Sequence, residues 1–386
     1  MRDVAEWALN RAEQLGTSYA DVRVVEWRDR FISTKNGQVG QANVSESLGV
    51  GVRVRAGGGW GFASTDRLTR QGVEQAASRA VEIARASALV KENGVSLVPE
   101  QKVEADWTSP IRQDPFQTSI EENIGLLLAV DAELRRVAGV TLAEASLHFR
   151  RHEQLFLSTL GSAIRQVRYY TGGGCVALSF AQNEIQKRSY PNSFGGQHRL
   201  GGYEVIEELR LVENAQRVAE QAVALHQADQ CPEGVCDLVL DSSQLALQIH
   251  ESIGHPIELD RVLGAEANFA GMSFLTLDKL NSLKYAAEMV NVVADARLEH
   301  GPGLGTFAFD DEGVAAQRAD IIRNGRFVGY LTSRETAGAV GQNRSNGAMR
   351  AENWNRIPLI RMTNVSLLPS DRTLEELIAS TEDGIY

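Results

Sequence analysis

The chain has 386 residues, of which 43% are hydrophobic and 23% charged, and its formal net charge is −11 at pH 7. This composition is typical of a globular protein with a buried core, and the length predicts two or three domains. Recognition of nucleic-acid phosphates or anionic membranes needs a basic surface, so the acidic balance argues against both kinds of partner.

The N-terminus and the cysteines bear on location. Asp3 and Glu6 interrupt the first apolar stretch, which therefore does not resemble a signal peptide. No run approaches the roughly 18 apolar residues of a membrane span. The chain has three cysteines, an odd and sparse set that gives no disulfide framework. We therefore predict a reducing, cytoplasmic location without membrane contact.

Residues 1–105 are predicted to form an N-terminal α+β domain. A helix over 2–15 is followed by strand-like runs between 21 and 65, with turns at Asn36-Gly37 and at Gly57 to Gly59. Apolar residues at helical spacing then predict a second helix over 69–88.

Residues 111–228 are predicted to form a central α+β domain of similar style, after a proline-containing linker. Helices are expected over 119–137 and 203–226, with strands between them and turns at Gly161 and at Gly172 to Gly174. His148 and His152 have helical ligand spacing, but they fall in a strand-like region between arginines and are interpreted as surface residues.

Residues 232–386 are predicted to form a C-terminal mixed β domain that carries a metal-site helix. A short buried strand over 236–240 leads into that helix, and Asn324-Gly325 marks a further hairpin. Asp310, Asp311 and Glu312 could bind a hard cation, but three adjacent acids are more typical of a solvated loop. The overall fold class predicted is α+β.

The segment QIHESIGHPIELDR, residues 248–261, carries the most specific chemistry. Asp241 and Gln244 form a capping-box pattern that starts a helix near Ser242. Leu245, Ala246, Leu247, Ile249 and Ile253 leave this helix few polar faces and predict that it is buried. A buried helix whose two histidines are merely hydrogen-bonded is one interpretation.

A metal site is the other interpretation, and we favour it. Residues five apart on a regular α-helix point roughly 140° away from each other, so His250 and His255 would not converge. Gly254 permits a π-like widening or an unwound turn, and Pro256 is expected to push His255 out of helical geometry. Glu251 would then lie beside the ion as a base for an attacking water.

The segment HESIGHPIELD resembles the His-Glu-x-x-x-His signature of the TldD/PmbA family of modulators of gyrase, in particular its TldD-type subunit. The stretches LGVGVRVRAGGGWGFAST, FDDEGVAAQ, IIRNGRFVGYL and RMTN agree with this family. The similarity runs from about residue 15 to the end, so it covers nearly the whole chain.

The resemblance implies a zinc-dependent peptidase that hydrolyses unfolded peptides through metal-activated water. His250 and His255 match the zinc-ligand histidines, and Glu251 matches the catalytic glutamate. Glu258 and Asp260 match acidic positions for which we expect a role in supporting the ligands. The resemblance also implies pairing with a PmbA/TldE-type subunit, or a homodimer.

The third ligand of the family is a cysteine in a C-terminal segment, and we expect that this chain lacks that segment. Ile385 and Tyr386 are predicted to begin a strand. Cys231 and Cys236 precede the helix and are interpreted as buried small hydrophobes, and His300 as a loop residue. The missing ligand favours an alternative, a non-catalytic peptide-binding or partner subunit, whereas the intact His250-Glu251 pair argues against it.

Overall fold

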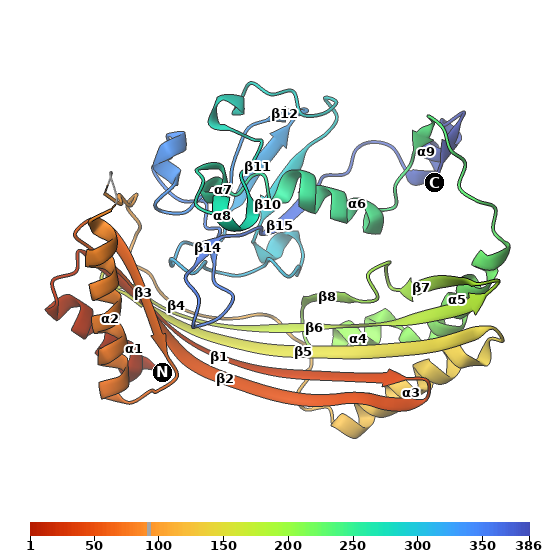
Figure 1. Cartoon of the computed structure of the whole chain (residues 1–386), viewed down its shortest axis with the longest axis horizontal. Coiled ribbons are helices and arrows are strands. Elements are labelled where there is room, and N and C mark those ends of the chain that lie inside the picture. Colours follow the sequence, from red (N-terminus) through yellow and green to blue (C-terminus); the bar gives the residue numbers. More distant parts are fainter. Residues whose placement is uncertain (91–93) are drawn as a thin grey trace.

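The computed structural model describes residues 1–90 and 94–386, apart from the side chains of Ala270 and His300. One eight-stranded sheet dominates, with strand order β3-β2-β1-β5-β6-β4, while β7 and β8 also pair with β6. Four long strands make it a curved platform (Figure 1): β1 (Tyr19–Lys35), β2 (Gln38–Ala56), β5 (Val140–Ser158) and β6 (Ala163–Ala181). The shorter strands are β3 (Gly59–Thr65), β4 (Glu104–Thr108), β7 (Glu184–Tyr190) and β8 (Gln197–Leu200).

Two turn predictions for this sheet had different outcomes. Asn36 and Gly37 both have positive φ, 49° and 79°, which confirms the two-residue hairpin between β1 and β2. The turn predicted at 172–174 is wrong, because these glycines lie inside β6. A Cβ atom on Gly172 would lie 2.4 Å from the carbonyl oxygen of Gln197 on β8. The glycine is therefore needed where β8 approaches β6, not for a turn.

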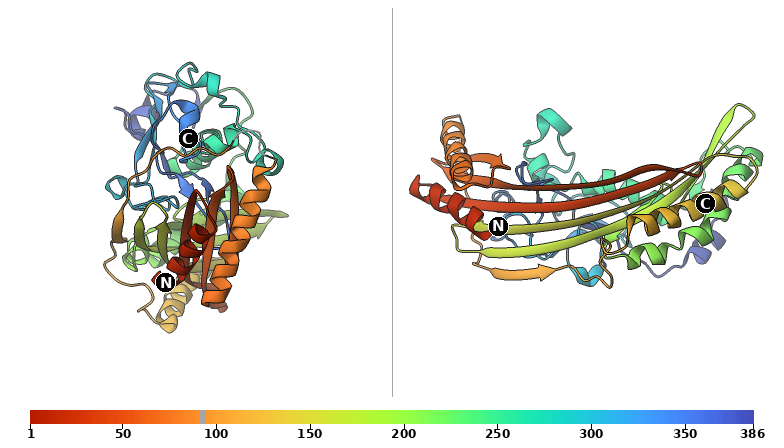
Figure 2. Two further views of the ribbon diagram at one scale, coloured as in Figure 1. Left: turned by 90° about the vertical axis from the view of Figure 1, so that its left-hand side faces the viewer. Right: turned by 90° about the horizontal axis from the view of Figure 1, so that it is seen from below.

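Five helices cover one face of the sheet in two groups (Figure 2). At one end, α1 (Arg2–Gln14) and α2 (Arg70–Ala88) pack on alternate residues of the strands, such as Val22, Val24 and Val52. At the other end, α3 (Ile120–Arg136), α4 (Glu204–Leu209) and α5 (Leu211–Ala224) pack on residues such as Leu147 and Phe149. The sheet thus carries two hydrophobic cores on one face.

The single helix predicted over 203–226 is wrong, because Arg210 separates α4 from α5. Its backbone has φ 48° and ψ 51°, a left-handed conformation that ends one helix and begins the next. Neither glycine nor proline marks this break, so the apolar periodicity runs through it without a sequence signal.

The C-terminal part contains a sheet of order β12-β11-β10-β15 and two separate strand pairs, β13-β14 and β16-β9. The strands are β9 (Asp237–Leu238), β10 (Val292–Asp295), β11 (Arg318–Arg323), β12 (Arg326–Phe327), β13 (Met349–Arg350), β14 (Leu359–Ile360), β15 (Asn364–Leu367) and β16 (Gly384–Ile385). The helices are α6 (Ser242–Ile249), α7 (Leu259–Val262), α8 (Ala267–Ala270) and α9 (Leu374–Ala379). The predicted strand at Ile385 is confirmed. The strand predicted over 236–240 is shorter, and Leu238 is 62% exposed, so it is not buried.

The α+β fold class predicted from the sequence is confirmed. The long sheet joins the two N-terminal units, since β1 of the first pairs with β5 of the second along 15 residue pairs, from Asp21 to Lys35. The domain limits 1–105, 111–228 and 232–386 stay a prediction. Within the described ranges, none of the helices combines the length and apolar character needed to cross a bilayer.

The C-terminal part sits on the face of the sheet opposite the helices, and the acidic run 310–312 anchors it there. Asp310, Asp311 and Glu312 are 2%, 4% and 3% exposed, so their interpretation as a solvated loop is wrong. Glu312 pairs with Arg53 on β2, and Asp311 pairs with Arg23 on β1. The arginines on the sheet explain the burial, because a buried carboxylate needs a charged or hydrogen-bonding partner.

Candidate metal centre

The two histidines converge because the helix widens between them. After α6, residues 250–254 form a π-helical turn in which the N–H of His255 donates to the carbonyl oxygen of His250, 3.1 Å away. The imidazole centroids lie 4.7 Å apart, with ring planes at 85°. The predicted widening is therefore present. His255 itself keeps helical angles, φ −67° and ψ −41°, so the expected displacement by Pro256 is wrong.

Glu251 completes the cluster. One ligand atom each of His250, Glu251 and His255 lie within 4.8 Å of one another. In the part of the chain that the structure describes, no other group of three histidine, cysteine or acidic side chains is gathered in this way. The two imidazoles and the carboxylate are a donor set that a divalent transition metal accepts.

The helix that carries the cluster is exposed, contrary to the prediction from its apolar residues. No residue of α6 is buried, and Leu247 is 46% exposed. His250 and Glu251 are exposed, and His255 is partly buried. The apolar pattern indicates which side chains favour burial, but it does not indicate whether another segment of the protein covers them. The cluster is therefore accessible to solvent.

Glu258 lies behind His255 and orients its ring. The carboxylate is completely buried, and its Oε2 lies 3.2 Å from Nδ1 of His255. A carboxylate only accepts hydrogen bonds, so Nδ1 carries the proton and Nε2 keeps the lone pair that a metal needs. Arg261 also donates to Oε2, at 2.9 Å from its Nη2. The role of Glu258 in supporting the ligands stays a prediction.

Asp260 has a different environment. Its carboxylate accepts from the backbone N–H of Ile360 at 3.0 Å and of Arg261 at 2.9 Å, and it has no hydrogen bond to either histidine. Burial, with the nearby charges of Glu258 and Glu266, raises the pKa of Asp260 to about 6. This residue fastens β14 to the segment that follows the histidines.

Gly254 allows the widened turn to pack closely against the segment after β14. A Cβ atom at this position would lie 2.0 Å from Sδ of Met362. A larger residue would therefore require Met362 to move away from the turn.

The other ligand candidates lie elsewhere. Cys231 and Cys236 are exposed, so their interpretation as buried hydrophobes is wrong, and neither belongs to the cluster of His250. The side chain of His300 lies outside the described part of the structure.

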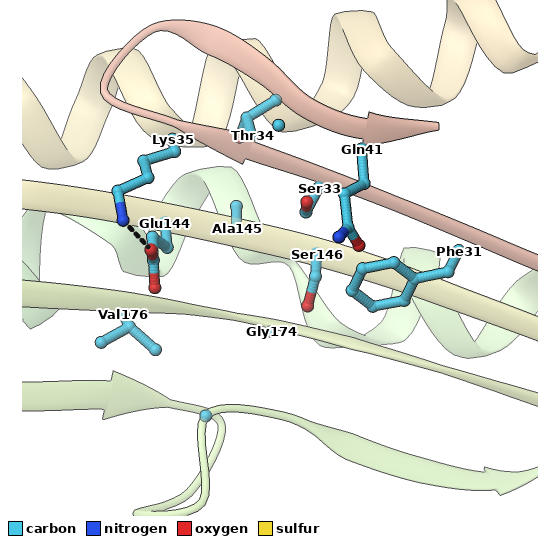
Figure 3. A pocket seen from close by; sticks show the side chains of 12 residues that line it. Phe31, Ser33, Thr34, Lys35, Gln41, Glu144, Ala145, Ser146, Gly174 and Val176 are labelled. Carbon is cyan, nitrogen blue, oxygen red and sulfur yellow. Dashed lines mark ion pairs between the residues drawn. The ribbon is translucent and has the colours of Figure 1, made fainter. Parts of the chain in front are cut away.

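Sequence reasoning missed a cavity of about 790 Å³ between the sheet and the C-terminal part. His148 and His152 line it and are partly exposed, so they are surface residues that face this cavity. The signal was present as the alternation His148, Arg150, His152 along one strand, which places three basic side chains on one face. A second cavity of about 420 Å³ lies further along the sheet, where Lys35 and Glu144 form an ion pair (Figure 3).

Comparison with family models accounts for most of the chain. The PmbA/TldA metallopeptidase domain 1 matches residues 20–84, the central domain matches 113–225 and the C-terminal domain matches 233–386. The chain belongs to the PmbA/TldD metallopeptidase family. The last match contains the whole cluster of His250, Glu251 and His255.

Related proteins of this family carry protease names. A metalloprotease of Methanocaldococcus jannaschii is 28% identical over 371 residues, which are 95% of this chain and 77% of that protein. A zinc metalloprotease TldD homolog of Saccharolobus solfataricus is 23% identical, over 98% of this chain and 79% of that protein. These names place the family among the metalloproteases.

Solved structures share the fold. A modulator of DNA gyrase from Thermotoga maritima superposes with a TM-score of 0.76 at 18% identity, over 98% of this chain and 79% of that one. TldE from Thermococcus kodakarensis gives a TM-score of 0.73 at 16% identity, over 98% and 80% of the two chains. At these identities the likeness concerns the fold alone.

Proposed function

We propose that this PmbA/TldD family member is a zinc-dependent peptidase that hydrolyses unfolded peptides. The observation that carries the proposal is the π-helical turn, which brings His250 and His255 onto one side of the helix with Glu251 beside them. A regular helix with the same sequence would separate the two rings. The protease names of the relatives support the same conclusion.

The donor set fits zinc. His250 and His255 would hold the ion, and the hydrogen bond from His255 Nδ1–H to Glu258 fixes the tautomer in which Nε2 can bind a metal. A bound zinc ion supplies Lewis acidity, which polarises a peptide carbonyl and makes water more acidic. Glu258 and Asp260 act on the cluster from behind, the first by orienting His255 and the second by fastening β14.

Glu251 would serve as the general base. Its carboxylate lies next to the two imidazoles and is exposed, so it can take a proton from an attacking water and return it to the leaving amine. An exposed cluster suits substrates in an extended conformation. Such a peptide can bind along an exposed edge of the protein through its main chain. This is the basis for proposing unfolded peptides.

A partner subunit is part of the proposal. The apolar side of α6 is uncovered, with Leu247 46% exposed, and an exposed apolar patch is typical of a protein interface. We propose a related PmbA/TldE-type subunit as the partner, or a second copy of this chain. We also propose that the protein is located in the cytoplasm.

The test compares the parent chain with Glu251→Gln, using zinc and a denatured protein substrate, with and without a PmbA/TldE-type subunit. The amide cannot accept the proton, so turnover should fall roughly 10²- to 10⁴-fold while bound zinc is unchanged. Glu288→Gln, an exposed acid that the structure places outside the cluster, is the control and should be fully active. Equal activity of Glu251→Gln and its parent would remove Glu251 from the mechanism.

A second candidate function is a non-catalytic peptide-binding or partner subunit. It is favoured by the size of the donor set, since catalytic zinc normally has three protein ligands and the cluster offers two imidazoles beside the proposed base. Peptide binding without turnover, with zinc and the partner both supplied, would establish this function instead.

A further inference from the structure

The larger cavity lies between the open face of the sheet and the C-terminal part. The sheet contributes His148, Arg150 and His152 from β5 and Arg168 from β6. These residues alternate along their strands, and the pairing of β5 with β6 places His152 opposite Arg168. Their side chains therefore share the face that the helices leave free. The C-terminal part adds Arg350, Arg356 and Arg361 from the other side.

Some of these arginines are already neutralised. Arg150 pairs with Asp29, and Arg356 with Glu352 at 3.6 Å. Arg361 pairs with Glu266 at 2.7 Å.

Two arginines keep uncompensated charge. Arg168 and Arg350 have no carboxylate within ion-pair distance among residues 1–90 and 94–386. Arg168 is 7% exposed, and its buried Nε has no hydrogen-bond partner. A buried polar atom without a partner is costly unless a ligand completes the site, which applies to Nε of Arg168, whereas Arg350 is exposed. The cavity of this acidic chain thus holds an excess of positive charge.

The nearby positive charge affects the protonation of His152. Nη2 of Arg168 lies 3.0 Å from Nδ1 of His152, and a guanidinium only donates, so Nδ1 accepts and the ring is neutral. Burial, together with the positive charges of Arg168 and Arg150, lowers the pKa of His152 well below its usual range. A neutral ring is the behaviour expected where positive neighbours surround a buried imidazole.

The cavity adjoins the candidate metal centre through one carboxylate. Oε2 of Glu258 lies 3.2 Å from Nδ1 of His255 and 4.0 Å from Nη1 of Arg361, which lines the cavity. Two contacts of one buried carboxylate thus separate His255 from a residue that lines the cavity.

We propose that this cavity, defined by Arg168 and Arg350, binds a carboxylate of the peptide substrate. The inference rests on the proposed peptidase function and adds a substrate class to it: peptides with an acidic side chain or a free C-terminus near the cleaved bond. Planar guanidinium groups match carboxylates through paired hydrogen bonds.

The remaining lining favours a peptide over a nucleic acid. Leu304, Ile357 and Leu359 give the cavity apolar walls, which suit the side chains that flank a carboxylate in a peptide. The net charge of −11 repels a polyanion such as a nucleic acid, whereas a single carboxylate can still bind at a locally basic cavity. The ring of Phe31, which lines the second cavity (Figure 3), contacts His148 of the larger cavity, with centroids 6.1 Å apart.

The experiment measures binding of fluorescent peptides to the whole chain by anisotropy, in chelator, so that no turnover is involved. Four peptides of one sequence carry acidic or amide side chains, each with a free or an amidated C-terminus. We expect the peptide with acidic side chains and a free C-terminus to bind more tightly than the peptide with amide side chains and an amidated C-terminus. Arg350→Gln should weaken that binding roughly 10-fold or more, as for loss of a charged hydrogen-bonding partner, and Arg350→Lys should weaken it less.

Two controls separate a local effect from a general one. Arg79 is exposed on α2, and its Nη1 lies 3.0 Å from Glu82. Arg79→Gln removes this charge and should leave peptide binding unchanged. In the parent chain, an acidic peptide should protect Arg350 from phenylglyoxal, read by mass spectrometry. This second measurement decides the question even where a variant does not fold.

Binding that survives amidation identifies acidic side chains, and binding that needs only the free C-terminus identifies the terminal carboxylate; either supports the proposal. Equal affinity for all four peptides, or preferential binding of a phosphopeptide or a DNA duplex, overturns it. Both measurements are made in chelator and involve no turnover, so failure of the catalytic proposal would leave them unchanged and is distinguishable from failure of this one.

Discussion

Nη1 of Arg53 lies 3.0 Å from Oε1 of Glu312, although 259 residues separate them in the chain. Arg53 also donates to Asp21, its neighbour across the β1–β2 pairing, at 2.6 Å from Nη2. All three side chains are at most 4% exposed. This buried network joins the long sheet to the C-terminal part that carries the histidines.

Arg53→Met should therefore destabilise the protein strongly. The substitution leaves Asp21 and Glu312 buried without their shared cation, a loss that costs about 3–5 kcal/mol in comparable pairs. Urea unfolding followed by circular dichroism gives the free energy of unfolding. Arg79→Gln, at an exposed pair on α2, serves as the reference and should change it by less than about 0.5 kcal/mol. Similar values for the two variants would contradict the role of the network.

Local chemistry made much of the fold predictable. The Asn36-Gly37 and Asn324-Gly325 turns follow from residues that tolerate positive φ, and both occur. The helix predicted over 119–137 is present as α3, and the side chain of Ser119 accepts from the N–H of Glu122 at its start. Such signals depend only on neighbouring residues, so they can be read without knowing the tertiary structure.

Features that depend on distant contacts were not predictable. The acids at 310–312 became buried because arginines on β1 and β2 receive them, and no local pattern reports that pairing. The apolar helix α6 stayed exposed because no described segment covers it. In the candidate site, spacing and Gly254 predicted the widened turn, whereas the basic cavity required knowing which elements face each other.

Gly254→Ala should disturb the π-helical turn. The added methyl group would lie 2.0 Å from Sδ of Met362, so the side chain of Met362 or the turn must shift. We expect a loss of about 1–3 kcal/mol in the free energy of unfolding, as for overpacking elsewhere, and weaker metal binding. Met362→Ala in the same chain makes room for the methyl group and should recover part of both losses.

The control for that series is Gly125→Ala. Gly125 lies inside α3, and a Cβ atom there meets nothing within 4 Å. Alanine should therefore stabilise the helix by about 0.4–1 kcal/mol. If Gly254→Ala were equally stabilising, close packing against Met362 would not explain the glycine.

Zinc binding should be weak and should depend on the histidines alone. Two imidazoles leave most of the coordination to water, so a chelator should remove the ion readily. His255→Ala should abolish binding in a zinc titration. Cys231→Ser together with Cys236→Ser should leave it unchanged, because both cysteines lie outside the cluster. Loss of affinity in the double serine variant would show that a cysteine contributes a ligand.

Asp260 should make stability depend on pH. Burial raises the pKa of its carboxyl to about 6, whereas in the unfolded chain it is about 3.9. Between these values the folded state binds more protons than the unfolded state, so the free energy of unfolding falls as pH rises from about 4 to about 6 and is level above. Asp260 should account for about 1–3 kcal/mol of this decrease.

Asp260→Asn isolates that contribution from the other titrating groups. Asparagine cannot ionise, and its amide oxygen can still accept from the N–H of Ile360, which Asp260 binds at 3.0 Å. The free energy of unfolding of both proteins is measured in urea at pH 4, 5, 6 and 7. The variant should become more stable relative to the parent as pH rises from about 4 to about 6, and the difference should then stay level. A difference that is constant across this range would mean that Asp260 titrates as it does in the unfolded chain. The two backbone hydrogen bonds would then offset the cost of burying its charge.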